Sequence, residues 1–208
     1  MTKKAESPAP EALTKARTTP DVVTVPDHTV LALEGSGSPD APDFAAAVGV
    51  LYGLAYTMRF ARKKADRPVF KVGPLAADWW AEGDDLPEDR IPDRDAWRWR
   101  VMMPLPNDAT DEELDEAVQA ATTKRGGKLE GSETAARARL SRVDSARYAR
   151  VLHKGPYSTE PASFARIQAL LDEEGLTREK RHTEVDLSDP SRTSEDKLKT
   201  VLLTRIVE

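Results

Sequence analysis

The chain has 208 residues, of which 39% are hydrophobic and 32% charged, so it can bury one core or two small ones while part of it stays solvated. The net charge of −5 argues against direct nucleic-acid binding, because phosphate contacts need a concentrated basic surface, and the absence of cysteine excludes disulfides, zinc–thiolate sites and cysteine nucleophiles. We find neither a signal-peptide pattern nor an apolar run that would span a bilayer. We therefore expect a cytoplasmic protein without a membrane partner.

The first part of the chain alternates between strand and helix patterns. Residues 1–25 show no apolar period and are predicted to be a disordered or loosely ordered arm. A domain follows over residues 26–208. In its first half, residues 26–141, the patterns predict strands at 29–35, 69–75 and 96–105 and helices at 42–64, 110–121 and 129–141.

The second half, residues 142–208, repeats the same order of elements. The patterns predict a strand at 146–153, a helix at 161–174 and strands at 181–188 and 196–207. Three pairs of residues lie the same distance apart in the sequence: Gly35 and Gly155, Phe44 and Phe164, Leu51 and Leu171. Chance matching is the alternative to duplication. The predicted fold class is α+β, with tandem duplicated βαββ modules and a central ligand cleft between them.

One predicted strand carries a row of ionisable side chains. Because alternate strand residues share a face, His182, Glu184 and Asp186 point one way, and Thr183 and Val185 point the other. A metal site would need a further ligand such as His153, since same-face neighbours lie roughly 6.6–7 Å apart along a strand. The chain has no compact ligand motif such as HExxH, so we expect no metal. A solvated sheet face is the plain alternative.

Glu184 and Tyr157 are the candidates for chemistry. A Glu among apolar strand residues either has a desolvation cost or serves a ligand, and Tyr157 follows Gly155-Pro156 at the mouth of a turn. Together they could orient a water and pass a proton. A solvated Glu and a packing Tyr remain the alternative. The adjacent Trp79 and Trp80 cannot both be buried on one face of a strand, so one of them should line a cleft or stay exposed.

Four blocks of the sequence resemble the GyrI-like small-molecule-binding domain family, in its stand-alone branch that includes cyclopropanoid cyclopropyl hydrolases. The blocks are LYGLAYTMRF (51–60), PLAADWW (74–80), VLHKGPYSTEPASFARI (151–167) and HTEVDLSDPSRT (182–193) with KLKT (197–200). The resemblance implies the tandem βαββ fold. It also implies that Tyr157 and Glu184 are catalytic, that Trp79 and Trp80 form aromatic walls, and that no cofactor is needed. The further predicted ligand contacts are Tyr56, Phe60, Trp99, Met103, His153 and His182.

The chain departs from the family pattern at several positions. Ala76 and Ala77 stand where Glu and Gly are usual, and Thr183 and Asp186 replace a second His and a Tyr. The resemblance implies a hydrolase that adds water to the strained cyclopropane of a flat, aromatic, yatakemycin-type alkylator, giving detoxification or self-protection. Two alternatives are a non-catalytic module that sequesters lipophilic or cationic drugs and, with less support, an inhibitor of gyrase type. The protein is expected as a monomer or a homodimer, the latter through an exposed edge strand at 196–207.

Overall fold

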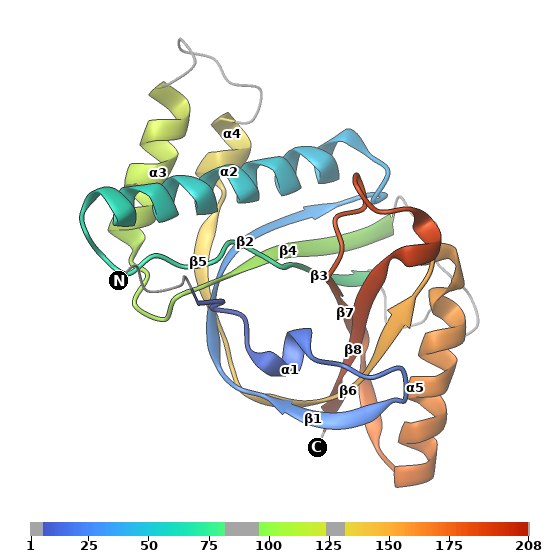
Figure 1. Cartoon of the computed structure of the whole chain (residues 1–208). Helices are drawn as coiled ribbons and strands as arrows, with labels where there is room; N and C mark the ends of the chain where they lie inside the picture. Colours follow the sequence, from blue (N-terminus) through green and yellow to red (C-terminus); the bar gives the residue numbers. More distant parts are fainter. Residues whose placement is uncertain (1–5, 82–95, 124–131, 208) are drawn as a thin grey trace. The chain divides into compact units, whose positions relative to one another are not determined.

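The computed structural model describes residues 6–81, 96–123 and 132–207 (Figure 1). The chain divides into two compact units. Unit 1 comprises Met1–Pro8, His28–Gly73 and Ala81–Val143, and unit 2 comprises Ala9–Asp27, Pro74–Trp80 and Asp144–Glu208. Unit 2 thus contains most of the second half read from the sequence, the segment Pro74–Trp80 of the first half, and Ala9–Asp27, most of which belongs to the predicted N-terminal arm.

The order of elements confirms the predicted α+β fold of tandem βαββ modules. The first module consists of β2 (His28–Ser36), α2 (Pro42–Lys64), β3 (Leu75–Ala81) and β4 (Trp97–Leu105). The second consists of β6 (Ala146–Lys154), α5 (Glu160–Glu174), β7 (Thr177–Asp186) and β8 (Lys199–Val207). Each α-helix of these modules begins with Pro in its first two positions, where the missing N–H costs no hydrogen bond.

The described residues of unit 1 form three antiparallel strands and three helices. β2 lies between β4 and β5 (Arg139–Val143). α2 packs on β2 and β4 and against α3 (Asp111–Thr123), with Leu51, Leu54 and Met58 fully buried. α4 (Ser132–Ala136) completes the unit. The buried positions of α2 recur at helical spacing, so the apolar stripe read from the sequence is the packed face of the helix.

Helix α2 also bears on the expectation that no segment could cross a membrane. By length and composition alone, the 23 residues of α2 would be enough to cross a membrane. Core helices of soluble proteins meet the same criterion. In this structure the buried face of α2 is occupied by β2, β4 and α3.

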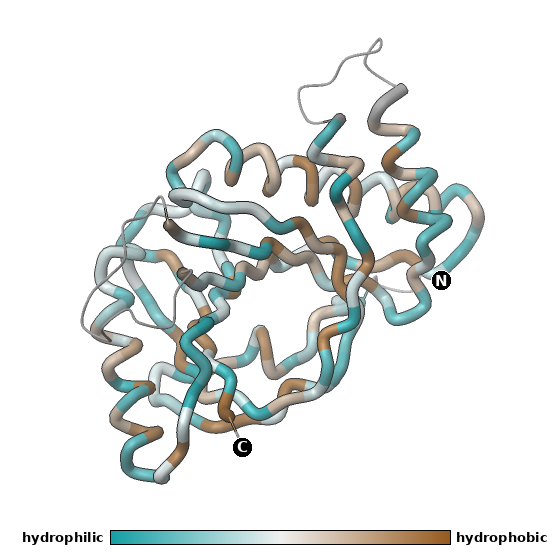
Figure 2. The backbone as a smooth tube through the Cα atoms, turned by 180° about the vertical axis from the view of Figure 1, so that it is seen from behind, coloured by the Kyte–Doolittle hydropathy of each residue, from teal (hydrophilic) through white to brown (hydrophobic). Residues whose placement is uncertain are grey.

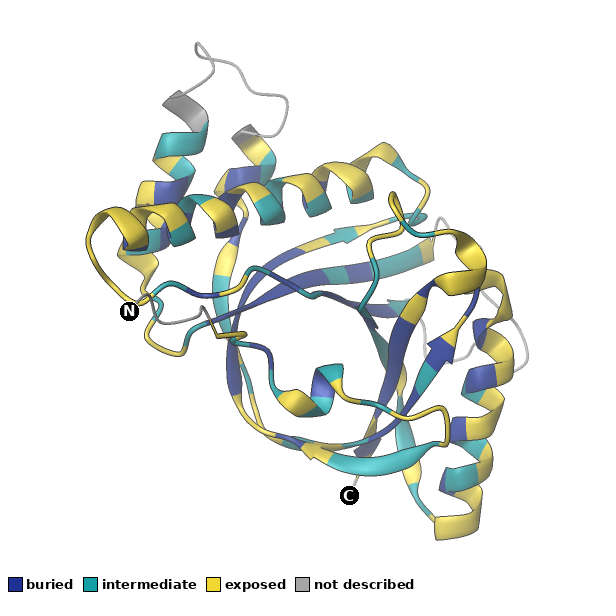
Figure 3. Ribbon diagram, viewed as in Figure 1, coloured by how far each residue is buried: buried dark blue, intermediate teal, exposed yellow. Residues whose placement is uncertain are grey.

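Unit 2 is built on five antiparallel strands in the order β1–β6–β8–β7–β3, where β1 is Asp21–Val25. Strand β8 was expected at an exposed edge, but it pairs with β6 on one side and β7 on the other. Most of β8 is buried, as Figure 3 shows. The expectation of an exposed edge at this strand is therefore wrong, because its backbone groups are already paired.

Helix α5 covers one face of this sheet. Ile167 and Leu171 are buried against Ala149, Val151 and Leu202. Figure 2 shows hydrophobic and hydrophilic bands alternating along the helix, as an amphipathic helix requires. Helix α5 ends at Glu174, and Gly175 caps it. The positive φ of Gly175, 66°, is the left-handed conformation that ends many helices.

The N-terminal segment differs from the loose arm expected from its composition. Glu11–Thr14 forms a short helix, α1, and β1 pairs with β6. Arg150 of β6 fixes this segment through a two-pronged ion pair with Asp21, at 2.9 and 3.0 Å, and a hydrogen bond to the Ala12 carbonyl. Tertiary pairing thus orders a segment whose local sequence has no apolar period.

Two further elements differ from the sequence-based expectation. The strand expected at 69–75 begins only at Leu75, because Gly73 has a positive φ of 90° and Pro74 lacks an N–H. Within the described part of the helix expected at 129–141, only α4 is an α-helix. Arg139–Val143 instead forms strand β5, which pairs with β2. The beginning of that expected helix lies outside the described residues.

Candidate functional site

In β7, the row formed by His182, Glu184 and Asp186 lies on the sheet face that α5 covers. In the antiparallel register Glu184 stands beside Leu202, which packs in the core under α5, and Asp186 stands beside Thr200. His182 is one further step along the same face, and its ring meets Phe164 of α5 edge-on at 4.8 Å. The row of ionisable groups read from the sequence therefore faces a helix rather than open solvent.

The buried stripe of α5 is polar at its start and apolar afterwards. Its buried residues are Glu160, Ser163, Ile167 and Leu171. Ile167 and Leu171 cover the apolar part of the sheet, whereas Glu160 and Ser163 in the first turns meet polar groups. This change of polarity along one helix face creates a partly buried polar cluster at the N-terminal end of α5.

A tight turn leads from β6 into α5 and carries Tyr157. Gly155 adopts a φ of 122°, which favours glycine, and its N–H donates to the carbonyl of Leu198. His153 lies beneath the turn: its Nε2 is 3.2 Å from the carbonyl of Pro156 and its Nδ1 2.9 Å from Ser163 Oγ. A carbonyl only accepts, so Nε2 carries the proton and Ser163 donates to Nδ1. His153, predicted as a ligand contact, is buried and holds this turn.

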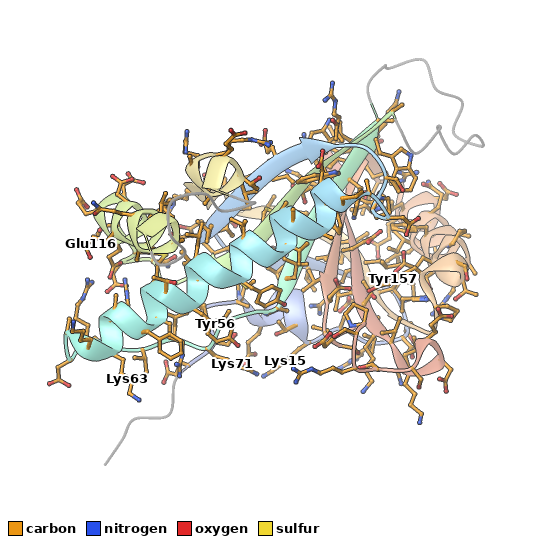
Figure 4. The ribbon with its side chains drawn as sticks, turned by 90° about the horizontal axis from the view of Figure 1, so that it is seen from above. Lys15, Tyr56, Lys63, Lys71, Glu116 and Tyr157 are labelled. Carbon is orange, nitrogen blue, oxygen red and sulfur yellow. The ribbon has the colours of Figure 1, made fainter. Side chains whose placement is uncertain are left out.

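Tyr157 points its hydroxyl at the carboxylate of Asp186. The residue lies in a short 3-10 turn, Tyr157–Thr159, and is labelled in Figure 4. It is 40% exposed, and its hydroxyl donates to Asp186 Oδ1 at 3.2 Å. Burial, followed by the charge of Asp186, raises the pKa of Tyr157, so the phenol remains a neutral donor. The hydrogen-bond partner of Tyr157 is thus Asp186, one of the residues at which the chain departs from the family pattern.

Glu184 lies between two other titratable groups. His182 Nε2 is 3.1 Å from Glu184 Oε1. On the side of α5, the charge of Glu184 acts on the buried carboxyl of Glu160. Burial raises the pKa of Glu160 well above its ordinary range, and the charges of Glu184 and Asp186 add to the effect. Burial and the charge of Glu184 likewise raise the pKa of Asp186 to about 6.

Glu160 is the site residue that sequence reasoning missed. It follows the turn residues 155–159 and precedes Pro161, so it looked like part of a polar turn. Its burial depends on the helix docking over β7, which no local pattern reveals. The available signal was its position in the first turn of a helix, three residues after the candidate Tyr157.

The two tryptophans of β3 point to opposite faces, as strand geometry requires. Trp79 is buried beside His182 in the register, on the face of the acidic row. Trp80 is half-buried, and the guanidinium of Arg181 lies 4.2 Å from its ring centroid. Asp78, the preceding residue of β3, accepts a hydrogen bond from the hydroxyl of Thr183 in β7 at 2.7 Å. Of the two predicted aromatic wall residues, Trp79 is therefore the one that shares the sheet face of the acidic cluster.

The other predicted ligand contacts belong to unit 1. Tyr56 and Phe60 are 45% and 57% exposed on α2, and their rings stack at 6.1 Å. Figure 4 shows Tyr56 projecting from this helix. Trp99 and Met103 are buried in the core of unit 1, with Trp99 edge-on to Phe44 at 5.4 Å. Both side chains pack in this core, and a ligand contact by Trp99 or Met103 stays a prediction.

The acidic cluster does not have the geometry of a metal site. No group of three or more His, Asp or Glu side chains within residues 6–81, 96–123 and 132–207 is arranged to hold a metal ion. The cluster instead contains two hydrogen-bond contacts, one from Tyr157 to Asp186 and one between His182 and Glu184. Its chemistry is therefore that of proton transfer and hydrogen bonding.

Two βαββ modules and a polar cluster under the first turn of one helix define an α+β protein of tandem modules. Residues 105–207 match the model of the GyrI-like small molecule binding domain. The chain therefore carries a GyrI-like small molecule binding domain, and all of the acidic cluster lies within the matched residues.

Solved structures similar to this chain agree with that assignment. An uncharacterized conserved protein from Listeria innocua is 29% identical, with a TM-score of 0.84, over 95% of this chain and 96% of that one. A hydrolase from Listeria innocua is 28% identical, with a TM-score of 0.81 and the same coverage. A second structure of a hydrolase from that organism is 26% identical, with a TM-score of 0.80. No curated protein matches the chain.

Proposed function

We propose that this protein is a cytoplasmic, cofactor-free hydrolase that binds a flat, aromatic, electrophilic small molecule and adds water to a strained cyclopropane. The observation that carries the proposal is the gathering of Tyr157, Glu184, Asp186 and Glu160 at the start of α5, inside the GyrI-like domain. Similarity to a hydrolase from Listeria innocua supports the reaction class. The biological result would be detoxification of, or self-protection against, DNA-alkylating compounds.

In this proposal Glu184 is the general base. It takes a proton from a water whose oxygen bonds to one carbon of the cyclopropane. The ring C–C bond breaks, its electron pair passes to a conjugated carbonyl of the ligand, and that oxygen then takes up a proton. Relief of ring strain drives the addition. Because His182 Nε2 lies 3.1 Å from Glu184 Oε1, the imidazole orients the carboxylate.

Tyr157 and Asp186 form the second half of the site. The neutral phenol hydrogen-bonds Asp186 and is partly exposed, so it can turn its hydroxyl toward a bound ligand or water. Trp79 lies on the same sheet face and offers apolar area for a flat ring. Ligand contacts by Tyr56, Phe60 and Trp80 remain predictions from the family resemblance.

The test is turnover of a cyclopropane-bearing DNA alkylator, with the ring-opened product followed by mass spectrometry. We expect Glu184→Gln and Tyr157→Phe each to lower kcat by about 10²-fold or more, because each removes one proton-handling group. Glu174→Gln, at the exposed far end of α5, is the matched control and should leave kcat unchanged. Wild-type protein that binds the alkylator without converting it would refute the hydrolase proposal. Normal turnover by both variants would refute the residue assignment.

The second candidate function is sequestration of a lipophilic or cationic drug without chemistry. It is favoured by the description of the matched domain, which is small molecule binding rather than catalysis. Here Glu184 would be the charge partner of the ligand. Tight binding by calorimetry, weakened by Glu184→Gln, together with an unchanged ligand after long incubation, would support this function.

A further inference from the structure

Helix α2 carries an apolar face that the rest of unit 1 leaves exposed. Figure 3 shows exposed positions recurring along the helix, yet residues 44–58 contain no charged side chain. A surface helix usually presents charged residues to solvent, as α5 does with Asp172, Glu173 and Glu174. The exposed positions in the middle of α2 are therefore uncharged, which is unusual for a helix face that only meets water.

Five exposed residues make up this face, which we call the α2 face: Ala46, Gly49, Gly53, Tyr56 and Phe60. They follow one another at intervals of three or four, so they lie on one side of the helix. Phe60 is the most exposed of the large apolar residues in the described ranges, and its ring stacks on that of Tyr56. Contiguous apolar surface of this kind marks an interaction site.

The α2 face is divided by side-chain size about Gly53. Phe60 lies seven residues after Gly53, and Ala46 lies seven residues before it. Tyr56 lies three residues after Gly53, and Gly49 lies four before it. A second α2 helix, antiparallel to the first and with its Gly53 opposite, would therefore place a small residue against each ring, so that ridges meet grooves. A parallel arrangement would place ring against ring.

The two ends of α2 are complementary in charge. The first turn carries Asp43, and the last turn carries Lys63 and Lys64, all three exposed. None of the three forms an ion pair with the residues that the structure describes. Asp43 lies ten residues before Gly53, and Lys64 lies eleven after it. The antiparallel arrangement that matches the side-chain sizes therefore also brings Asp43 of each copy to Lys64 of the other, with the helix dipoles opposed.

We propose that the α2 face binds a second copy of this chain, with the two α2 helices antiparallel about a twofold axis at Gly53. The twofold axis makes each contact occur twice. One helix face is smaller than the about 800 Å² per partner of a standard interface, so the dimer is weak and depends on concentration. The proposal does not depend on the hydrolase function. Because the family resemblance predicts ligand contacts by Tyr56 and Phe60, a ligand is a rival occupant of this face.

Sedimentation velocity of the full chain at concentrations from about 2 to about 200 µM tests the association, since a weak dimer dissociates on dilution. The mass should rise from that of one chain toward that of two. Phe60→Asp should weaken association by about tenfold or more, because it sets a charge in the apolar seam. Ala46→Arg should do the same without removing a ring, because it fills the place of Phe60 from the other copy. Ala169→Asp adds a charge at an exposed position of α5 and is the matched control, which should associate as wild type does.

Charge reversal tests the antiparallel arrangement. Asp43→Lys and Lys64→Asp should each weaken association by about three- to tenfold, and the double variant should restore it. Within one helix the two positions lie about 32 Å apart, so recovery requires contact between copies. Helix stability cannot produce the recovery, because each reversal opposes the helix dipole and the two losses add. Circular dichroism and melting of every variant establish that it is folded.

Several results would overturn the proposal. The wild type could remain monomeric over the whole range, or Phe60→Asp and Ala46→Arg could associate as strongly as the wild type, which would place the contact elsewhere. A double variant without recovery would exclude the antiparallel pair. A monomer that sediments with vesicles of phosphatidylcholine and phosphatidylglycerol, and loses this property in Phe60→Asp, would assign the face to a membrane surface. A monomer in which Phe60→Asp weakens only the binding of the alkylator would assign it to the ligand.

Discussion

At the scale of single residues, two glycines of unit 1 lie in different surroundings, so replacing each by alanine should change stability differently. A methyl group on Gly35 in β2 would overlap the indole ring of Trp99, whereas nothing lies within 4 Å of the corresponding position on Gly53 in α2. Gly35 thus makes room for a core tryptophan, while Gly53 weakens a helix interior without a packing reason.

We expect Gly35→Ala and Gly53→Ala to have opposite effects on stability. Gly35→Ala should lower the free energy of unfolding by about 1–3 kcal/mol through overpacking against Trp99. Gly53→Ala should raise it by about 0.5–1 kcal/mol, because alanine loses less backbone entropy in a helix. Urea denaturation of the two variants measures both values. Effects of the same sign would contradict the packing described for Trp99.

Residue by residue, the candidate site could be predicted only in part. Glu184 and His182 stood out because strand alternation placed them on one face, and Tyr157 because it follows Gly155 and Pro156. Glu160 and the Tyr157–Asp186 hydrogen bond escaped prediction, since each depends on α5 docking over β7. Local patterns carry no information on which polar residue of a turn becomes buried.

At the scale of elements, a buried arginine joins α2 to α3. Arg62 is 2% exposed, and its Nε and Nη2 donate to the two oxygens of Glu113 at 2.9 and 2.8 Å. Its Nη1 donates to Asp108 at 2.9 Å. Glu113 also caps α3, because its carboxylate and Thr110 exchange hydrogen bonds with each other's backbone N–H. Glu113 therefore caps the N-terminus of α3 and also binds Arg62 of α2.

Arg62→Met should lower the free energy of unfolding by about 3 kcal/mol, because it leaves the mostly buried Glu113 without its two-pronged partner. Arg67→Met is the matched control: Arg67 also pairs with Glu113, at 2.6 Å, but is 42% exposed. Its loss should cost no more than about 1 kcal/mol. Guanidinium denaturation compares the two, and equal losses would show that burial of Arg62 does not decide the energy.

The elements themselves were predictable where the pattern was long. The 23 residues of α2 show a continuous helical period, and the predicted bounds agree with Pro42–Lys64. The five residues of β5, in contrast, follow an Ala/Arg-rich stretch with helical composition. Their pairing with β2 decides their conformation. Short elements are set by tertiary partners, so β1 and β5 could not be read from local sequence.

At the scale of the whole molecule, the buried carboxyls couple folding to pH. The pKa of Asp186 is raised to about 6 by burial and the charge of Glu184, from an ordinary value of 3.8. Between these values the folded protein binds more protons than the unfolded chain, so stability falls as pH rises. Glu160 acts in the same direction at higher pH. The acidic cluster thus opposes the usual loss of stability in mild acid.

Asp186→Asn should remove part of this pH dependence. Below about pH 4 Asp186 is protonated in both states, so the variant should match wild type there. Above about pH 6 the wild type bears the cost of a buried charge, and the neutral amide should be more stable by up to about 3 kcal/mol, while its oxygen still accepts from Tyr157. Asp144→Asn, in the exposed connection between β5 and β6, is the control. Denaturation curves at about pH 4.5 and pH 7.5 give the comparison, and a constant difference between Asp186→Asn and wild type would show that Asp186 ionises as freely in the folded protein as in the unfolded chain.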